Sequence, residues 1–333
     1  MHMADALLSP VVGGAFWIVS GALIGYSAKK IAQEGDHSRT PLMGVLGAFI
    51  FAAQMINFTI PGTGSSGHLG GGLLLSILLG PYRAFITLAS VLVIQCMFFA
   101  DGGILALGCN IFNLAFFPAF ITYPLIYKKI AGESLLQTRI LGGSIAAALI
   151  GLLAGASSVI FQTVISGVSD LPFQTFMMFM LPIHAGIGVV EGLVTFSVVF
   201  FIVKASPGML KTRLAVKSDK KVLVIFVVAS IVTAGVLSQF ASSHPDGLEW
   251  SIEKTSSSGA FAGKFSQLVH GTLQTVQEKV AFLPDYSFKP DALNGDTKKL
   301  AATSVAGVTG CSIFLIVTIA TALIVRSKIQ KAR

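Results

Sequence analysis

Long runs of apolar residues dominate the chain, and polar residues gather in the stretches between them. Runs of about twenty residues fit membrane-crossing helices, because a helix rises about 1.5 Å per residue and the hydrocarbon layer is about 30 Å thick. Strands of a membrane barrel would instead alternate apolar and polar residues over about ten positions. The pattern therefore predicts an all-α membrane protein.

Nine apolar segments are predicted. They are Val11–Ala28, Pro41–Asn57, Leu69–Gly80, Ala84–Ala100, Cys109–Tyr127, Ile140–Ser166, Ile183–Val203, Val222–Phe240 and Ser304–Val325. Leu69–Gly80 is short for a crossing, so it either extends through neighbouring loop residues or ends below the surface. The apolar stretch Leu171–Leu181 precedes Pro182, which predicts a break and a span that starts near Ile183.

Basic residues set the expected orientation. If the N-terminus lies outside, the cytoplasmic side receives 17 of the 23 Lys and Arg residues, 13 of them in loops and 4 in the C-terminal tail. The short outer loops hold none, and the other six fall in one long outer segment, where the positive-inside rule has little force. The prediction is therefore N-out and C-in.

This arrangement divides the chain into two parts. Residues 1–204 are predicted to form a seven-span bundle, and residues 205–221 a basic cytoplasmic linker. Residues 222–333 then form a two-span hairpin with a polar extracytoplasmic segment at 241–303. Within that segment, the apolar spacing of Phe261–Phe282 predicts an amphipathic helix.

Composition supports a multi-pass protein of the cell membrane, with the lipid bilayer as its surroundings. Hydrophobic residues make up 53% of the chain and charged residues only 11%, against about a quarter in soluble domains. The positive-inside pattern accounts for the net charge of +8, so nucleic acid is not expected as a partner. No G-x-x-x-x-G-K-[ST] sequence occurs, and no ATP binding by this chain is expected.

The first two residues offer a candidate metal site. A free amine on Met1, the amide nitrogen of His2 and its Nδ1 close five- and six-membered chelate rings around one ion. A planar set of nitrogen donors suits Ni(II) or Cu(II) better than Zn(II). The site requires the first span to stay uncleaved, which is expected because a basic n-region is missing and Asp5 precedes the apolar run.

A second histidine is predicted on the same face. His68 follows a loop rich in glycine, whose residues permit tight backbone approach, and it is a candidate fourth nitrogen donor. The alternative is a polar residue at the start of a span, with Ser66 as an ordinary N-cap. Asn57, Asn110 and Asn113 cluster at the same outer level, where they are candidates for orienting the ligand histidines.

Two further polar residues lie in the seventh span. His184 is a candidate supporting or relay residue, or a hydrogen-bonded structural histidine. Glu191 is an ionisable residue about two turns into the span, which makes it a functional candidate. The alternative for Glu191 is a pairing with a buried polar group that holds the bundle together.

Four motifs together resemble the CbiM/NikM family of substrate-specific components of energy-coupling factor importers. They are Met1–Pro10, Asn57–His68, Asp101–Asn113 and His184–Gly192. Behind them, Pro245–Glu249 resembles the PDGLE domain, or the similar two-span NikN/CbiN subunit. The residues after Met1 and those of the glycine-rich loop both differ from the family's more usual sequence, but neither difference removes a candidate metal-binding nitrogen.

The resemblance implies an ATP-driven importer that takes Ni(II) or Co(II) as its substrate. It implies metal binding by Met1, His2 and His68, and partners comprising a transmembrane coupling subunit and cytoplasmic ATPase subunits. The planar nitrogen set favours nickel. The chain itself is then a transporter subunit and not an enzyme. The alternative is a stand-alone membrane metalloenzyme or metal receptor that uses His184 and Glu191.

Overall fold

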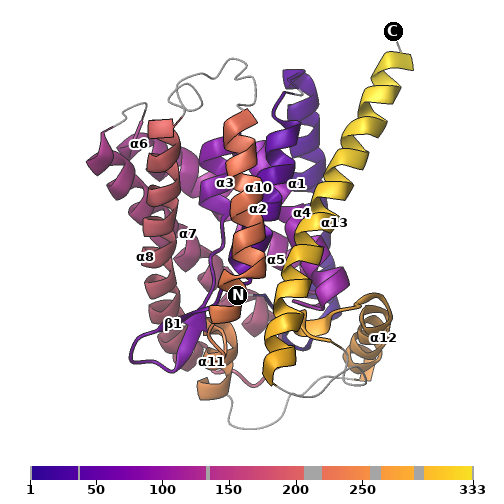
Figure 1. The fold of residues 1–333 in the computed structure, drawn as a ribbon. Coiled ribbons are helices and arrows are strands. Elements are labelled where there is room, and N and C mark those ends of the chain that lie inside the picture. The colour runs from indigo at the N-terminus through magenta and orange to yellow at the C-terminus, as the bar shows by residue number, and fades with distance from the viewer. Residues whose placement is uncertain are drawn as a thin grey trace.

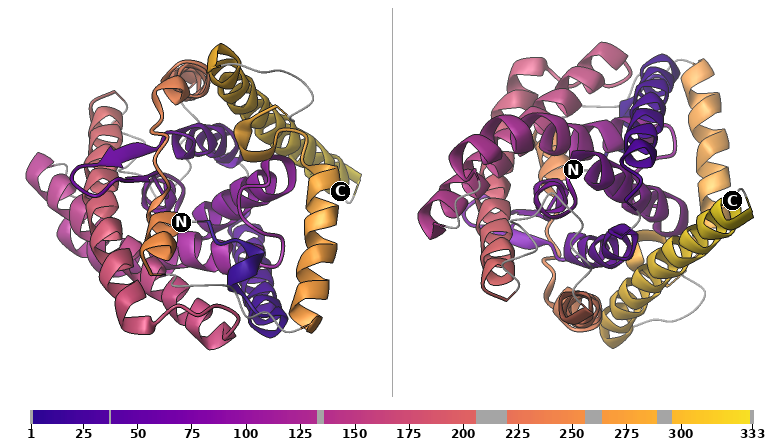
Figure 2. Two further views of the ribbon diagram at one scale, coloured as in Figure 1. Left: turned by 90° about the horizontal axis from the view of Figure 1, so that it is seen from below. Right: turned by 90° about the horizontal axis from the view of Figure 1, so that it is seen from above.

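The computed structural model describes residues 2–36, 38–132, 136–205, 220–255, 264–288 and 296–331. Helices that run along one common direction form a bundle, and the strands that it contains are one short hairpin (Figure 1). Viewed along the helices, the bundle is closed, with α13 on its rim (Figure 2). The predicted helical membrane-protein class is therefore confirmed.

The elements follow the order of the apolar segments. The first part holds η1 (Asp5–Leu7), α1 (Pro10–Glu34), α2 (Thr40–Gln54), β1 (Phe58–Ile60), β2 (Ser65–Gly67), α3 (Gly72–Leu79), α4 (Pro81–Phe99), α5 (Leu107–Ile111), the π-helix η2 (Phe112–Tyr127), α6 (Lys128–Ile130), α7 (Gln137–Ser166) and α8 (Phe173–Ala205). The second part holds α10 (Lys220–Gly235), η3 (Leu237–Phe240), α11 (Gly247–Thr255), α12 (Lys264–Val280), η4 (Pro284–Tyr286) and α13 (Asp296–Lys331). The predicted amphipathic helix is thus present as α12.

Within the described residues, six helices are long and apolar enough to cross a membrane. They are Pro10–Glu34, Pro81–Phe99, Leu107–Ile130, Gln137–Ser166, Phe173–Ala205 and Ala301–Thr321. The other three predicted segments form the shorter helices α2, α3 and α10. The arrangement of seven plus two spans stays a prediction.

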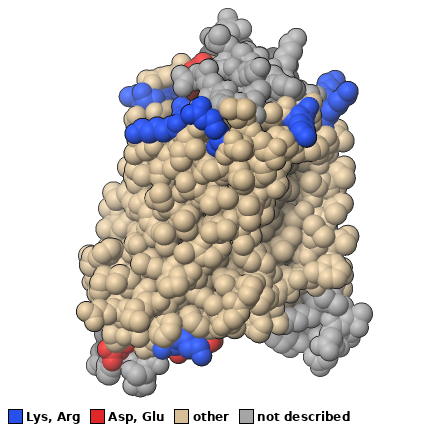
Figure 3. Space-filling view, turned by 90° about the vertical axis from the view of Figure 1, so that its left-hand side faces the viewer, with Lys and Arg blue, Asp and Glu red and all other residues tan. Residues whose placement is uncertain are grey.

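The bundle has two chemically different ends. The hairpin end carries β1, β2, α11 and α12, and the opposite end carries α6 and the last turn of α13 (Figure 1). On the face shown in Figure 3, Lys and Arg gather mainly near the opposite end, and a broad band between the ends shows no charged side chain. Such a band fits the hydrocarbon layer of a membrane.

The third segment enters the bundle as non-helical chain before it forms a short helix. Leu69–Gly71 is not helical, and all eight residues of α3 are buried. Eight helical residues at about 1.5 Å each and three non-helical ones at no more than about 3.3 Å each together span at most roughly 22 Å. Non-helical backbone thus precedes a short buried helix, and whether this segment crosses the membrane or ends below its surface stays a prediction.

The predicted break at Pro182 is wrong, because α8 runs through it from Phe173 to Ala205. Proline removes one hydrogen bond from the helix, and close packing on α7 outweighs that loss. A Cβ added at Gly188 would lie 2.7 Å from the Cα of Leu149, and one at Gly192 only 2.5 Å from the Cα of Ile145. These two glycines, one turn apart, allow the two backbones to approach, as small residues do in membrane helices.

The C-terminal hairpin packs on α2 through interlocking glycine and phenylalanine residues. A Cβ at Gly47 of α2 would lie 2.1 Å from the ring of Phe314 on α13, and one at Gly310 would lie 2.0 Å from the ring of Phe51 on α2. Each ring therefore fills the space above a glycine of the other helix. This packing fixes the second part of the chain against the first, with its loops over the hairpin end.

Candidate metal centre

The N-terminal segment is folded into the hairpin end of the bundle. Met3 is fully buried, and its main chain bonds to the side chain of Asn110 on α5. The Met3 N–H donates to Asn110 Oδ1 (2.8 Å), and the Asn110 Nδ2 donates to the Met3 carbonyl (3.2 Å). That carbonyl also accepts from the N–H of Gly103 (2.9 Å). Hydrogen bonds therefore fix both the N–H and the carbonyl of Met3, the residue that follows His2.

The loop before α5 completes this anchor. Asp5 accepts a hydrogen bond from the N–H of Ala106 (3.0 Å) through its Oδ1. A Cβ at Gly103 would lie 1.8 Å from the same oxygen, so only glycine fits there. The glycine in the Asp101–Gly103 turn thus lets the N-terminal segment lie directly against the loop.

Asn113 contacts the side chain of Met3. Its Nδ2 lies 3.6 Å from the Met3 sulfur and 2.7 Å from Gln162 Oε1, while the Gln162 Nε2 donates to Asn113 Oδ1 (2.9 Å). The side-chain hydrogen bonds of Asn110 and Asn113 therefore go to Met3 and Gln162 and not to an imidazole. Sequence reasoning missed Gln162, although a glutamine inside a long apolar run was a usable signal.

The β hairpin places His68. Phe58 pairs with Gly67 in antiparallel register, and Gly62 and Gly64 take positive φ angles of 78° and 77° in the turn. A Cβ at Gly67 would lie 2.4 Å from Ile187, so the strand can lie flat on α8. The His68 Nδ1 lies 3.1 Å from the carbonyl of Leu69. Because a carbonyl only accepts, Nδ1 carries the proton and Nε2 carries the lone pair.

The imidazoles of His2 and His68 lie together. Their ring centroids are 5.1 Å apart and their planes differ by 12°, a stacked arrangement. Burial lowers the pKa of both imidazoles to about 3, so both are neutral at physiological pH. Neutral imidazole is the form that binds a metal.

Asp101 holds the His2 ring. Its Oδ1 lies 3.2 Å from His2 Nδ1, and its Oδ2 accepts the hydroxyl of Tyr286 (2.7 Å). In this arrangement the Nδ1 of His2 carries a proton. Its Nε2 is buried and has no hydrogen-bond partner within the part of the chain that the structure describes. Met1 lies outside the described residues.

Glu191 binds backbone in the membrane region. Its two carboxylate oxygens accept the N–H groups of Gly70 (2.7 Å) and Gly71 (3.1 Å), just before α3 begins. On the other side, Gln54 Nε2 donates to the Gly70 carbonyl (2.9 Å). Non-helical backbone is tolerated at membrane depth only where such partners satisfy it. Glu191 therefore supports the chain that follows His68.

The segment Pro245–Glu249 covers the hairpin. Ser66 donates its N–H to the Pro245 carbonyl (2.8 Å) and its hydroxyl to the His244 carbonyl (2.8 Å). The carbonyl of Asn57 accepts the N–H of Ser242 (2.7 Å). Both Ser66 and Asn57 thus contact the second part of the chain, a role that the sequence did not suggest.

Asp246 begins α11 in a capping box. Its Oδ1 accepts the N–H groups of Leu248 (2.8 Å) and Glu249 (2.9 Å), and Glu249 Oε2 accepts the N–H of Asp246 (3.1 Å). This is the reciprocal pattern that stabilises helix starts. A Cβ at Gly247 would lie 2.6 Å from Ile183, so this residue must be small. The motif therefore docks α11 against α8.

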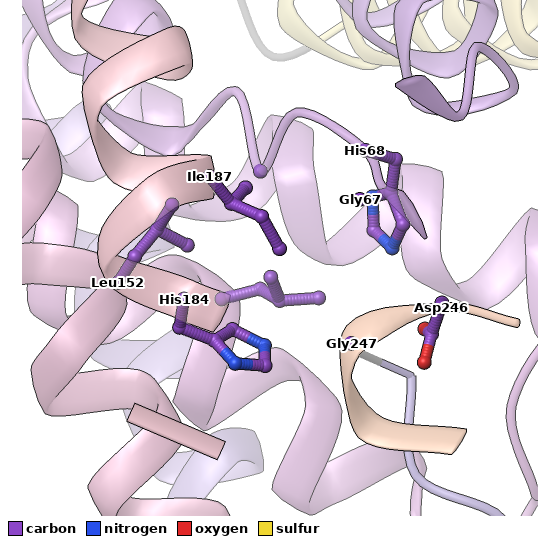
Figure 4. Close-up of a pocket in the computed structure, with 9 residues that line it drawn as sticks. Gly67, His68, Leu152, His184, Ile187, Asp246 and Gly247 are labelled. Carbon is purple, nitrogen blue, oxygen red and sulfur yellow. The ribbon is translucent and has the colours of Figure 1, made fainter. Parts of the chain in front are cut away.

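His184 of α8 lies below this cover. It lines a small cavity together with His68 and Asp246, whose side chains are seen around it in Figure 4. Among the described residues, no three His, Cys, Asp or Glu side chains are close enough to hold one ion.

A larger cavity opens on the other side of the N-terminal segment. It has a volume of about 410 Å³, and His2, 7% exposed, is part of its wall. We call it the acidic vestibule, because its lining includes the carboxylates of Asp5, Asp101, Asp246, Glu249 and Asp285. Helix α12 closes one side, where Gln277 donates to the Gly102 carbonyl (2.7 Å) and His270 Nε2 lies 2.9 Å from the Leu8 carbonyl.

Comparisons with known proteins agree with this architecture. The family model for the cobalt uptake substrate-specific transmembrane region, CbiM, matches residues 2–209, and the PDGLE domain matches residues 220–327. A protein of Archaeoglobus fulgidus that bears the name putative fused nickel transport protein NikMN is 33% identical over 95% of this chain and 96% of its own. The fused nickel transport protein NikMN of Rhodobacter capsulatus is 36% identical over 34% of this chain and 33% of its own.

A solved structure is also similar. The crystal structure of a transition metal transporter is 29% identical, with a TM-score of 0.55, and the match covers 63% of this chain and 96% of that one. The family assignment and the fold thus point the same way. The chain belongs to the CbiM family and carries a PDGLE domain behind its CbiM region.

Proposed function

We propose that this chain captures Ni(II) or Co(II) as transported substrate, as the metal-binding subunit of an energy-coupling factor importer in the cell membrane. The stacked pair of buried, neutral imidazoles at His2 and His68 is the observation that carries the proposal. The proposal is also supported by similar proteins whose names describe nickel or cobalt transport.

In the proposed site, the terminal amine of Met1, the amide nitrogen and Nδ1 of His2, and Nε2 of His68 bind the ion in one plane. The ion takes the place of the Nδ1 proton that now faces Asp101. The imidazole proton moves to Nε2, so the ring stays neutral, and the amide proton of His2 is released to water. The tautomer of His68 supports this arrangement, since its Nε2 already carries the lone pair. Four nitrogen donors in a plane favour nickel over cobalt on geometric grounds.

The proposed orientation puts the hairpin end outside. Basic residues near the opposite end would then face the cytoplasm, as the positive-inside rule requires (Figure 3). Metal would be captured outside, and the coupling subunit and the ATPase subunits would supply the energy from inside. The alternative of an enzyme centred on His184 and Glu191 is less favoured, because both Glu191 oxygens are engaged by backbone N–H groups.

The test compares metal binding by the native chain with binding by a chain that has one extra residue before Met1. The proposal requires that the mature protein begins at Met1, which intact mass measurement checks first. Extension displaces the amine without changing a side chain. It should weaken Ni(II) binding by more than the roughly 10–100-fold that loss of a supporting group costs, and remove the visible band of planar Ni(II).

Two substitutions complete the test. His68→Ala should weaken binding in the same way, whereas the exposed His244 is a matched control and its replacement by Ala should change little. Equal Ni(II) affinity of the native and extended chains would contradict the proposed site.

A further inference from the structure

His184 carries a lone pair that the fold leaves without a partner. The side chain is only 1% exposed, and its Nδ1 lies 2.8 Å from the carbonyl of Met180 in the same helix. A carbonyl only accepts, so Nδ1 holds the proton and Nε2 holds the lone pair. Within the described chain, Nε2 has no hydrogen-bond partner. A buried acceptor without a partner lowers the stability of the folded protein, so a ligand bound to this atom would be stabilising.

The orientation of this ring is typical of a metal ligand. Histidines that bind metals generally donate their second ring nitrogen to a carbonyl or carboxylate, which fixes the tautomer and the ring. His184 meets that condition through Met180, and His68 meets it through Leu69. Both rings are therefore fixed, with the proton on Nδ1 and the lone pair on Nε2.

The two rings line one cavity, together with the carboxylate of Asp246 (Figure 4). Two imidazoles and one carboxylate form a donor set that suits divalent first-row metals. The cavity holds about 10 Å³, room for roughly one water-sized guest. Gly247 covers it closely, since a Cβ there would lie 3.2 Å from His184 Cε1.

We propose that His184 is a second binding position for the transported ion, with His68 as the shared ligand of the two sites. This step rests on the proposed function. The ion leaves the N-terminal donors while it stays on His68, and then gains bonds to His184 Nε2 and Asp246. Its charge is unchanged, and the His2 amide nitrogen regains a proton from water. Because the three groups do not yet converge on one point, the second position forms only when the ion draws them together.

The second position lies between α8 and the segment Pro245–Glu249, since a Cβ at Gly247 would lie 3.2 Å from His184 Cε1. His184 is part of the long helix α8, and a main-chain carbonyl of the same helix fixes its ring. His68 stands at the end of the β hairpin, beside the extended chain that leads to α3. An ion that passes from His2 to His184 therefore moves from the N-terminal segment to the cavity between α8 and Gly247.

The experiment uses the full chain with one extra residue before Met1, which removes the outer site and leaves the second position as the remaining site. Co(II) is the probe, because its visible absorption reports coordination geometry. The extended chain should keep one site, about 100-fold or more weaker than the native site. Adding His184→Gln should remove that residual binding, and adding Asp246→Asn should weaken it about tenfold. Both amides keep polar groups of similar size, and Asn also keeps the cap of α11.

Further comparisons separate the possible results. His184→Gln in the native chain should change the Co(II) affinity by no more than a few-fold, because the outer site does not use His184. His244→Ala in the extended chain should leave the residual site intact. Thermal unfolding of each variant establishes that the fold survives.

Two results would overturn the second position alone: an extended chain with no residual Co(II) binding, or residual binding that survives His184→Gln. Equal binding by native and extended chains would overturn the outer site and, with it, the two-site sequence.

Discussion

Asn110 contacts the main chain of Met3 through both its amide oxygen and its amide nitrogen. The side chain therefore positions His2, the neighbouring residue, through the peptide that follows it. Asn110→Ala should leave a buried N–H of Met3 without its acceptor, which costs about 1–3 kcal/mol of stability. Metal affinity should fall about 10–100-fold, as it does on loss of a supporting group. Isothermal titration with Ni(II) and thermal unfolding in detergent measure the two effects.

Asn57 offers a matched control for this prediction. Its bond to the second part of the chain uses its main-chain carbonyl, which any residue supplies. Asn57→Ala should therefore change affinity little. If Asn110→Ala bound Ni(II) like the native chain, the position of His2 would not depend on the Met3 anchor.

For the individual residues, the sequence indicated which side chains lie near one another, but not which atoms form hydrogen bonds. His2, His68, Asn110 and Asn113 do lie at one end of the bundle. The asparagines were expected to orient the histidines, whereas they bond to Met3 and Gln162. Contacts between residues about a hundred positions apart, and contacts to main-chain atoms, depend on the tertiary fold and leave no local signal.

Among the elements, the segment from His68 to α3 depends most on a single side chain. Glu191 accepts two backbone N–H groups there, and a carboxylate offers an oxygen to each. Glu191→Gln keeps the shape but replaces one oxygen by an NH₂ group, which cannot accept. The variant should lose about 1–3 kcal/mol of stability. The measurement is thermal unfolding in detergent.

The control replaces Glu253, an exposed residue of α11, by Gln, and its unfolding temperature should stay unchanged. A Glu191→Gln variant as stable as the native protein would show that the carboxylate is not needed to hold the extended chain. That result would make Glu191 a candidate for chemistry again.

Helices could be predicted where the apolar runs are long. They were harder to predict where contacts with residues distant in sequence decide the backbone conformation. Leu69–Gly71 stays non-helical because Glu191 and Gln54 satisfy its backbone, and both partners are distant in sequence. Pro182 signalled a break by a local rule, but Gly188 and Gly192 bring α8 so close to α7 that the helix continues.

Across the whole molecule, the second part of the chain lies over the first. The sequence predicted the polar segment and its amphipathic helix, but apolar spacing carries no information on what such a segment covers. In the structure, Ser66 bonds to the residues before Asp246, and Gln277 of α12 bonds to the loop at Gly102. Together with the N-terminal segment, these contacts enclose the acidic vestibule.

The vestibule makes a prediction about the rate of metal capture. Five carboxylates line it, two of which, Glu249 and Asp285, are exposed and come from the PDGLE domain. Negative charge around a cleft attracts a divalent cation and raises its association rate, up to about 10–10³-fold in favourable cases. Replacing both residues by their amides should lower the Ni(II) association rate roughly threefold to tenfold at low ionic strength. The dissociation rate should stay unchanged, because neither residue is a proposed ligand.

Salt separates this effect from damage to the site. The Debye length falls from about 30 Å at 0.01 M to about 3 Å at 1 M, so native and double-variant rates should converge as salt rises. Glu249→Gln keeps an acceptor for the capping box of α11, and Asp285→Asn places a residue that tolerates the positive φ of 49° found there. Asp170→Asn is the control, since this exposed carboxylate is not part of the vestibule lining. Stopped-flow measurements that found equal slopes of rate against salt would mean that the ion reaches His2 by another route.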